Sequence, residues 1–219
     1  LRLNTCQRVV DVVLGAFISV LPEKITGAAN GANTSAVFAG TNPNNGKRYV
    51  YLETLGGGMG ARFTKDGKDG VQVHLTNTSN LPVEAIEMEY PLRVEEYSCV
   101  EYSGGAGKYR GGLGIRRIIR PIAHKCEFSG VGERFKHSPW GVFGGQPGKP
   151  GKFYLKHKNG KITNLSSKSS SIYTNENDAI VMETPGAGGY GNPKKRSKNN
   201  ILKDKISGKF SNSFLKKYY

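Results

Sequence analysis

The spacing of apolar residues predicts one helix near the start of the chain. Within residues 7–21, five large apolar side chains recur at helical intervals, at Val10, Val13, Leu14, Phe17 and Leu21. Asn4 or Thr5 is suited to cap the first turn, and Pro22 follows the last periodic residue. We therefore expect an amphipathic helix that buries its apolar side against another surface.

The rest of the chain is patterned as short β-strands. We predict strands at 47–54, 71–75, 93–102, 114–122, 126–132, 152–157, 161–165 and 179–183, and one more inside the loop-like segment 27–46. Asn159-Gly160 separates two of these strands and is the strongest hairpin signal in the sequence. The fold class that follows is α+β: predominantly antiparallel β, with an N-terminal amphipathic helix and glycine-rich loops.

Glycine changes this picture, because it supplies 30 of the 219 residues, about twice its usual share of ~7%. The glycines are clustered, which indicates turns and close backbone approaches. Gly56–Ala61 fits the spacing G-x-G-x-x-A, but turn-like residues follow it instead of the helix that a dinucleotide site requires. Gly104–Lys108 lacks the Ser or Thr of a P-loop. Both segments are therefore turns or strand connectors. Alternatively, the bare backbone amides of Gly56–Ala61 line a pocket for an anion or a carbonyl oxygen.

Positive charge is concentrated at the C-terminal end. The formal net charge is +15, and residues 194–219 contribute nine Lys or Arg against one acid, Asp204. We predict a body at 1–193 and a basic, flexible tail at 194–219. Such a tail is a solvated extension, or it binds a polyanion. A non-catalytic basic nucleic-acid-binding domain is therefore one alternative function, although no zinc-finger, RNP or basic-zipper pattern supports it.

Other features narrow the class of protein. The sequence has no run of about 18 apolar residues, so we expect no transmembrane helix. Its three cysteines form no CxxC pair, which favours a reducing cytoplasmic location over a disulfide framework. The four histidines lack HxxxH and HxH spacing, and we predict no metal site within this chain.

Two places carry side chains suited to catalysis. Residues 74–80 gather one histidine, three hydroxyls and two amides, which can orient a substrate or donate to an oxyanion. The alternative is that Asn and Thr side chains cap a turn there, while His74 satisfies a buried acceptor. Glu53 is the carboxylate of most interest, because it stands just before the triple glycine. The other glutamates between 84 and 96 are expected to be solvated.

Taken together, the motifs resemble those of the hydantoinase B/oxoprolinase family. They occur in the family's order, at Tyr51–Arg62, Asp66–Gly70, His74–Thr78, Pro82–Glu84, Tyr90–Val94, Ser103–Gly112, Pro139–Gly141, Gly144–Gly148, Glu183–Gly186 and Gly188–Pro193. The resemblance covers residues 1–193 and corresponds to the C-terminal part of a longer subunit. Because the chain starts at Leu1 without a Met, we expect it to be a fragment or a split-gene product.

The resemblance implies part of an ATP-dependent cyclic-amide hydrolase, which acts with an ATP-binding hydantoinase A-type subunit and with the remainder of the B-type subunit. A ketone carboxylase of the acetone carboxylase type is the other reading. The family's divalent metal is expected on the N-terminal part outside this chain and ATP on the partner subunit, so this segment should bind neither and should be inactive alone. A small cyclic amide is the expected substrate.

Seven residues are the predicted pocket. We expect His74 and Glu53 to be catalytic. The residues expected to bind the substrate are Gly57, Gly58, Arg62, Asn77 and Thr78. In this scheme the glycine amides polarise a carbonyl, Arg62 holds an anion, and His74 transfers a proton.

Overall fold

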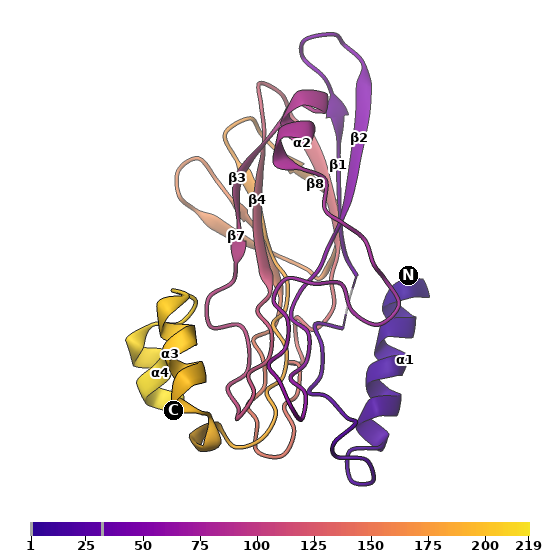
Figure 1. The fold of residues 1–219 in the computed structure, drawn as a ribbon. Coiled ribbons are helices and arrows are strands. Elements are labelled where there is room, and N and C mark those ends of the chain that lie inside the picture. The colour runs from indigo at the N-terminus through magenta and orange to yellow at the C-terminus, as the bar shows by residue number, and fades with distance from the viewer. Residues whose placement is uncertain (1, 32) are drawn as a thin grey trace.

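The computed structural model describes residues 2–31 and 33–219, which form one elongated body. A sandwich of β-strands occupies one end, and extended segments that run side by side occupy the other (Figure 1). Helix α1 (Arg2–Ala16) lies along one side of the extended segments. Helices α3 (Lys198–Ile206) and α4 (Asn212–Tyr218) lie on the opposite side.

Two antiparallel sheets build the sandwich. The first has the order β2-β1-β5-β8, from β1 (Thr34–Thr41), β2 (Arg48–Leu55), β5 (Cys126–Val131) and β8 (Lys168–Thr174). The second has the order β3-β4-β9-β6-β7, from β3 (Leu92–Cys99), β4 (Ile115–Pro121), β6 (Lys152–Lys156), β7 (Ile162–Leu165) and β9 (Ala179–Glu183). The predicted fold class is confirmed.

Alternating side chains of both sheets fill the core between them. Inward positions of β4 are buried and outward ones half-buried, as the period of two requires. Phe38, Phe128 and Phe153 form successive ring contacts, with centroids 5.2 and 5.9 Å apart. Each is at most 1% exposed, so this aromatic column joins the two sheets.

Most predicted strands are present, with two differences. The hairpin at Asn159-Gly160 is confirmed, because β6 pairs with β7 and Gly160 has φ +82°. The predicted strand 71–75 is wrong: only Val71 bridges to Gly57, and the chain turns at His74, which has φ +56°. Strand β8 was not predicted, since its serine-rich sequence lacks a clear apolar alternation. A short helix, α2 (Val83–Glu89), follows Pro82.

Helix α1 presents a polar face to the body. Its inner face is polar and buried, at Asn4, Gln7 and Asp11. Its outer face is apolar, with exposed fractions of 49–70% at Val9, Val12 and Val13, while Val10 and Leu14 are half-buried. The predicted burial is therefore met only in part within the described chain: Val10 and Leu14 are half-buried, whereas Val13, Phe17 and Leu21 are exposed. The fully buried side of the helix is polar because its side chains find hydrogen-bond partners in the body.

The glycine-rich segments pack backbone against backbone. Segment 185–190 runs through their centre, where N–H groups of Ala187, Gly188 and Gly189 donate to carbonyls on three other segments, at Gly112, Ala28 and Gln146, over 2.9–3.0 Å. A Cβ at Gly188 would overlap the carbonyl of Trp140. The glycines are thus needed for close approach. We call this lower half of the body the glycine bundle, comprising residues 26–30, 56–61, 103–114, 139–148 and 185–190.

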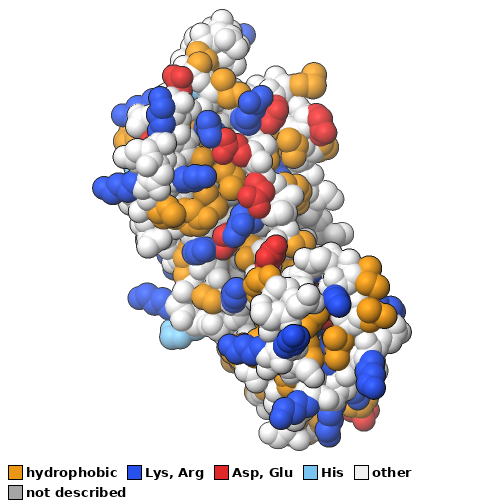
Figure 2. Space-filling model, turned by 90° about the vertical axis from the view of Figure 1, so that its left-hand side faces the viewer, with side chains coloured by type: hydrophobic (Ala, Val, Ile, Leu, Met, Phe, Trp, Pro, Cys, Tyr) orange, Lys and Arg blue, Asp and Glu red, His pale blue; other side chains and the backbone are white. Residues whose placement is uncertain are grey.

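The basic C-terminal segment is folded onto this bundle. After a 3-10 turn at Pro193–Lys195, Ser197 and Ser211 cap α3 and α4 with their side-chain oxygens. Apolar residues of the segment form a small core against the body, with Leu113, Tyr102, Ile201, Phe210, Phe214 and Leu215. The structure therefore differs from the expected flexible tail, because its aromatic and aliphatic side chains bury together. Lysine side chains remain spread over the outward face (Figure 2).

Candidate functional site

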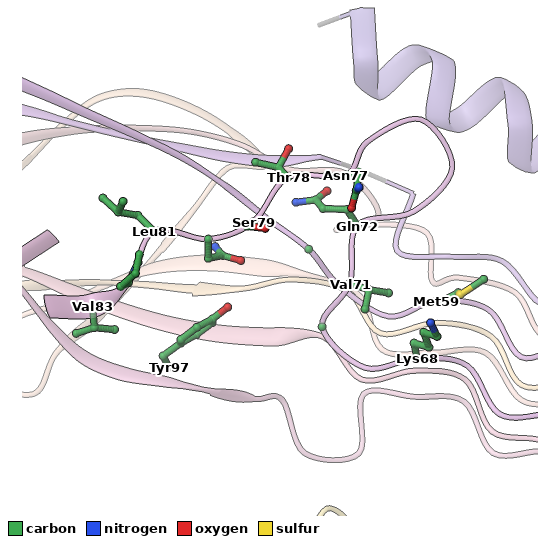
Figure 3. Close-up of a pocket in the computed structure, with 14 residues that line it drawn as sticks. Met59, Lys68, Val71, Gln72, Asn77, Thr78, Ser79, Leu81, Val83 and Tyr97 are labelled. Atoms are coloured by element: carbon green, nitrogen blue, oxygen red, sulfur yellow. The ribbon is translucent and has the colours of Figure 1, made fainter. Parts of the chain in front are cut away.

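A cavity of about 680 Å³ lies where the sandwich meets the glycine bundle. Backbone at Gly56 and Gly70 forms one side, and the irregular segment 77–83 forms the other. Figure 3 shows Gln72, Asn77 and Thr78 on the loop above it and Tyr97 of β3 below. Most of the polar groups are neutral amides and hydroxyls, apart from Lys68.

The segment 77–81 separates this cavity from a second one. Thr78, Ser79, Asn80 and Leu81 line both, and the second cavity, of about 440 Å³, also contains Glu53. Among the described residues, the side chains of Asn77, Thr78 and Ser79 make no hydrogen bond to the protein. Their donors and acceptors are therefore available to a molecule in these cavities.

Glu53 lies on β2 and points between the two sheets. Its Oε2 accepts a 2.9 Å hydrogen bond from the Tyr51 hydroxyl and lies 3.2 Å from Nη2 of Arg117 on β4. Oε1 has no partner among the described residues. Burial raises the pKa of Glu53, and the positive charge of Arg117 and the Tyr51 hydrogen bond oppose this only in part.

Arg117 links the two cavities from behind. The residue has no exposed surface, and its guanidinium lies 4.4 Å from the ring centroid of Tyr97. Tyr97 lines the first cavity and Glu53 the second, so one buried cation supports both walls. Sequence reasoning missed Arg117, because β4 contains three arginines and the sequence does not indicate which of them points inward.

The side chain of His74 is positioned by a residue of α1 and does not line either cavity. Its Nε2 lies 3.1 Å from Oδ1 of Asp11, and its side chain is 16% exposed. Burial alone would raise the pKa of Asp11. Hydrogen bonds from His74 and Arg134, with the charges of Arg134 and Arg8, outweigh burial and hold that pKa below its usual value. Asp11 therefore stays ionised and fixes one ring nitrogen of His74.

The remaining predicted residues are dispersed. The N–H groups of Gly57 and Gly58 donate within the bundle, to Val71 and Pro185, each over 3.0 Å. Gly56, the glycine before them, lines the first cavity instead. Arg62 lines neither cavity, and its backbone N–H closes a turn onto Lys65. Thr78 thus lines both cavities, whereas Asn77 lines only the first and Glu53 only the second, and His74 precedes segment 77–81.

Ligands for a metal ion are not gathered in the described part of the chain. Across residues 2–31 and 33–219, no three side chains of His, Cys, Asp or Glu lie close enough to hold one. The residues present do not fit the family's divalent metal, and its expected place outside this chain stays a prediction. Within the same residues, no helix has the length and apolar character needed to cross a membrane.

The sequence is similar to a known protein family and to several proteins of that family. Residues 1–193 match the family model described as hydantoinase B/oxoprolinase. An uncharacterized protein of Methanocaldococcus jannaschii is 44% identical over 210 residues, which cover 96% of this chain and 36% of that protein. The B-type subunit of a putative D-/L-hydantoinase from a Pseudomonas species is 32% identical over 94% of this chain and 34% of its own length. The 5-oxoprolinase of Dictyostelium discoideum is 36% identical over 85% of this chain and 14% of its own length.

Two solved structures share the fold. The ATP-dependent caprolactamase from Pseudomonas jessenii superposes with a TM-score of 0.80 at 24% identity, over 92% of this chain and 36% of the caprolactamase chain. Acetone carboxylase superposes with a TM-score of 0.76 at 18% identity, over 93% of this chain and 31% of the acetone carboxylase chain. The chain therefore spans about a third of these proteins and of the first two sequence relatives.

Proposed function

Because this chain belongs to the hydantoinase B/oxoprolinase family, we propose that it forms one part of an ATP-dependent cyclic-amide hydrolase. In this proposal it acts with the remainder of a B-type subunit and with an ATP-binding hydantoinase A-type subunit. The names of its relatives support the reaction class, since they include a hydantoinase and 5-oxoprolinases. Its contribution is a wall of the reaction chamber.

The observation that carries the proposal is the neutral polar wall of the first cavity. A cyclic amide presents a carbonyl acceptor and an N–H donor on one compact ring. Asn77, Thr78 and Ser79 each donate and accept, and none is engaged by the described protein. The cavity volume of about 680 Å³ falls within the usual range of roughly 300–1,000 Å³ for small-molecule sites.

Glu53, which lines the second cavity, is the proposed proton acceptor. Its raised pKa and its unpartnered Oε1 suit a group that takes up a proton during hydrolysis. His74, oriented by Asp11, is the second proton carrier. Gly57 and Gly58 act through shape, because their amides are already used and their bare Cα atoms let the bundle close beneath Gly56.

Other groups of the complete enzyme supply the remaining chemistry. ATP bound by the partner subunit would activate the amide oxygen. The described residues offer the family's metal no ligand set, and its proposed place is the remainder of the B-type subunit. Arg62, whose Nε has no partner among the described residues, remains a predicted anion contact.

The test is a ring-opening assay on the complete complex. The B-type polypeptide containing this sequence is purified with its ATP-binding partner and given hydantoin, 5-oxoproline or caprolactam with ATP. We expect ATP-dependent ring opening of at least one of them. Asn77→Ala and Thr78→Ala should each lower kcat/KM about tenfold, because a lost hydrogen bond to a substrate amide contributes roughly 1 kcal/mol or more.

Asn164→Ala is the matched control, because Asn164 is exposed on β7 and lies outside the cavities. This variant should keep full activity. Ketone carboxylation is the competing reaction, and acetone with bicarbonate and ATP is tested in parallel. Carboxylation without any ring opening would refute the proposal, and so would full activity in Asn77→Ala and Thr78→Ala.

A further inference from the structure

A second cluster of charged side chains lies against the inner face of α1, apart from the two cavities. Asp11 is its centre, forming ion pairs with Arg8 of the same helix and with Nη2 of Arg134 at 2.7 Å. Arg134 is 8% exposed and Asp11 is 5% exposed. Two buried or half-buried arginines thus share one carboxylate.

The two guanidinium groups converge over the backbone of Gly31. A Cβ at this glycine would overlap the Arg8 guanidinium and stand 2.8 Å from Nε of Arg134. Arg134 itself has φ +56°, a left-handed conformation that costs energy in any residue with a side chain. The fold therefore holds two like charges together, at a cost in backbone strain.

This arrangement gives two positive charges a single contacting carboxylate, that of Asp11. Nε of Arg8 and Nε of Arg134 have no hydrogen-bond partner among the described residues. Burial lowers the pKa of Arg8, and the charge of Arg134 lowers it further. Glu133 is another acid nearby, but its carboxylate is 28% exposed and lies 3.9 Å from Lys168. Within the described part of the chain, Asp11 is the single carboxylate in direct contact with both arginines.

A cavity of about 440 Å³ opens beside these arginines. Asp11 also lines it, so the two arginines leave one positive charge in excess, and the remaining walls are apolar, from Val12, Ile18 and the indole ring of Trp140. A ligand that fits must therefore present an anionic group at one end and an apolar body at the other. A carboxylate matches the planar, forked donors of arginine better than a spherical anion does.

We propose that Arg8 and Arg134 bind the carboxylate of a small apolar acid, whose body packs against Trp140. The cavity alone specifies this ligand and the proposed function does not, because hydrolysis of a cyclic amide breaks its C–N bond and releases an amine together with the carboxylate, so the ring-opened product is not an apolar acid. His74 also contacts Asp11, so occupancy of the cavity is coupled to the proposed proton carrier.

Trp140 provides a direct readout, because it is the only tryptophan in the sequence. Hexanoate is titrated into the 219-residue protein at constant ionic strength, and indole fluorescence is followed with excitation that spares tyrosine. Hexanamide, which has the same shape without the charge, is the matched probe. We expect saturable binding of hexanoate and at least about tenfold weaker binding of hexanamide, because a charge-assisted hydrogen bond is lost.

Arg8→Gln tests the site at its half-exposed arginine, and Arg48→Gln is the control on the exposed surface of β2. Arg8→Gln should weaken hexanoate binding about tenfold and leave hexanamide unchanged, whereas Arg48→Gln should change neither. Arg8→Lys keeps the charge but loses the two parallel N–H donors of the guanidinium, so its affinity for hexanoate should lie between those of wild type and Arg8→Gln. Circular dichroism confirms that each variant is folded before titration.

Three results would overturn the inference: no saturable fluorescence change with hexanoate, equal affinity for the acid and the amide, or unaltered hexanoate binding in folded Arg8→Gln. The titration needs neither ATP nor other subunits. A complex that opens no ring, with intact hexanoate binding here, would refute the proposed function and leave the carboxylate site standing. The reverse outcome would remove the site alone.

Discussion

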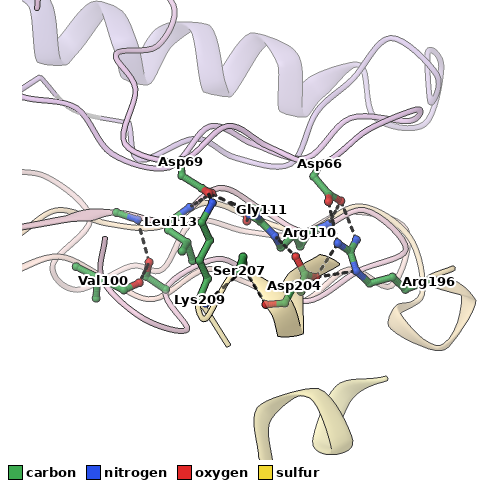
Figure 4. A network of polar contacts seen from close by, with 12 residues as sticks. Asp66, Asp69, Val100, Arg110, Gly111, Leu113, Arg196, Asp204, Ser207 and Lys209 are labelled. Atoms are coloured by element: carbon green, nitrogen blue, oxygen red, sulfur yellow. Dashed lines mark hydrogen bonds and ion pairs between the residues drawn. The ribbon is translucent and has the colours of Figure 1, made fainter. Parts of the chain in front are cut away.

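Arg110 and Asp204 are 94 positions apart in the sequence, and Nε of Arg110 donates a 3.0 Å hydrogen bond to Oδ1 of Asp204. Arg196 donates to the other oxygen of the same carboxylate over 2.7 Å. Asp69 and Asp66 hold the two arginines from the side of the body, each over 2.8 Å (Figure 4). One acidic residue of α3 therefore ties the C-terminal helices to the glycine bundle.

Removing Asp204 should release these helices. Asp204→Ala leaves two buried arginines without a shared counter-ion, and we expect a loss of about 3–5 kcal/mol in the free energy of unfolding. Urea denaturation measures this loss, and hydrogen exchange should show faster exchange at 198–218. Glu89→Ala, an exposed acid on α2, is the control and should change neither. Wild-type exchange rates in Asp204→Ala would contradict the role of the network.

The same network predicts sensitivity to acid. Burial alone would raise the pKa of Asp69. Hydrogen bonds from Arg110 and Lys209 and the charge of Arg110 outweigh burial, so this pKa lies below its usual value. In the unfolded chain Asp titrates near 3.9. The stability that the ionised carboxylate contributes is therefore fully present above about pH 4 and is lost as the pH falls through the lower folded pKa.

Urea midpoints measured from pH 7 down to pH 3 test this expectation. Wild type should lose stability progressively below about pH 4. Asp69→Asn should be less stable at pH 7, because Arg110 and Lys209 lose an ionic partner, and it should lose less on acidification. Parallel curves for the two proteins would show that Asp69 does not contribute to the pH dependence.

The glycine bundle predicts opposite effects for two similar substitutions. Gly188→Ala pushes a methyl group into the carbonyl of Trp140, and we expect a loss of at least about 2 kcal/mol, because backbone cannot move aside as a side chain can. Gly15→Ala places its methyl group 3.5 Å from the Trp140 ring inside a helix and should stabilise by about 0.5 kcal/mol. Thermal unfolding compares the two; a destabilising Gly15→Ala would contradict the packing.

The orientation of α1 is tested by a pair of substitutions on its two faces. Val13→Lys places a charge on the outer face and should change the free energy of unfolding by no more than about 0.5 kcal/mol. Gln7→Leu removes the donor of a 2.8 Å hydrogen bond to the Val73 carbonyl and should cost about 1–3 kcal/mol. The reversed ranking in urea denaturation would mean that the apolar face is the buried one.

The strands of the sandwich could be predicted because local and tertiary requirements agree there. Ile115, Ile119 and Ile180 are β-branched residues that face the core, and their strands lie close to the predicted bounds. Gly160 likewise occupies the left-handed position that its hairpin demands. The positions at which the chain needs glycine could therefore be predicted, but the segments that pack against each glycine could not.

The faces of α1 could not be predicted, because periodicity gives the spacing of a helix but not its surroundings. Gln7 is buried since Val73 and Thr76 offer it partners 66 and 69 positions away. The segment after 194 was misjudged for a related reason. Its lysines dominate the composition, while Phe210 and Leu215 find their apolar partners in the body.

The candidate site was predicted in part. Glu53, Asn77 and Thr78 were expected to share a pocket; Asn77 lines the first cavity, Glu53 the second and Thr78 both, so their common pocket stays a prediction. Arg117 and Asp11 were missed, because a buried charge is recognised only once its partner is placed. Whether the predicted residues act on a substrate stays a prediction, for which the ring-opening assay is the measurement.

The glycine bundle limits how this protein can vary. Where one segment's N–H meets another segment's carbonyl with no side chain between them, as at Gly188 and Ala28, almost any larger residue disturbs several neighbours at once. The irregular stretch 77–81 tolerates exchange better, because the side chains of Asn77, Thr78 and Ser79 make no hydrogen bond to the described protein, although Asn80 donates to the Thr54 carbonyl on β2.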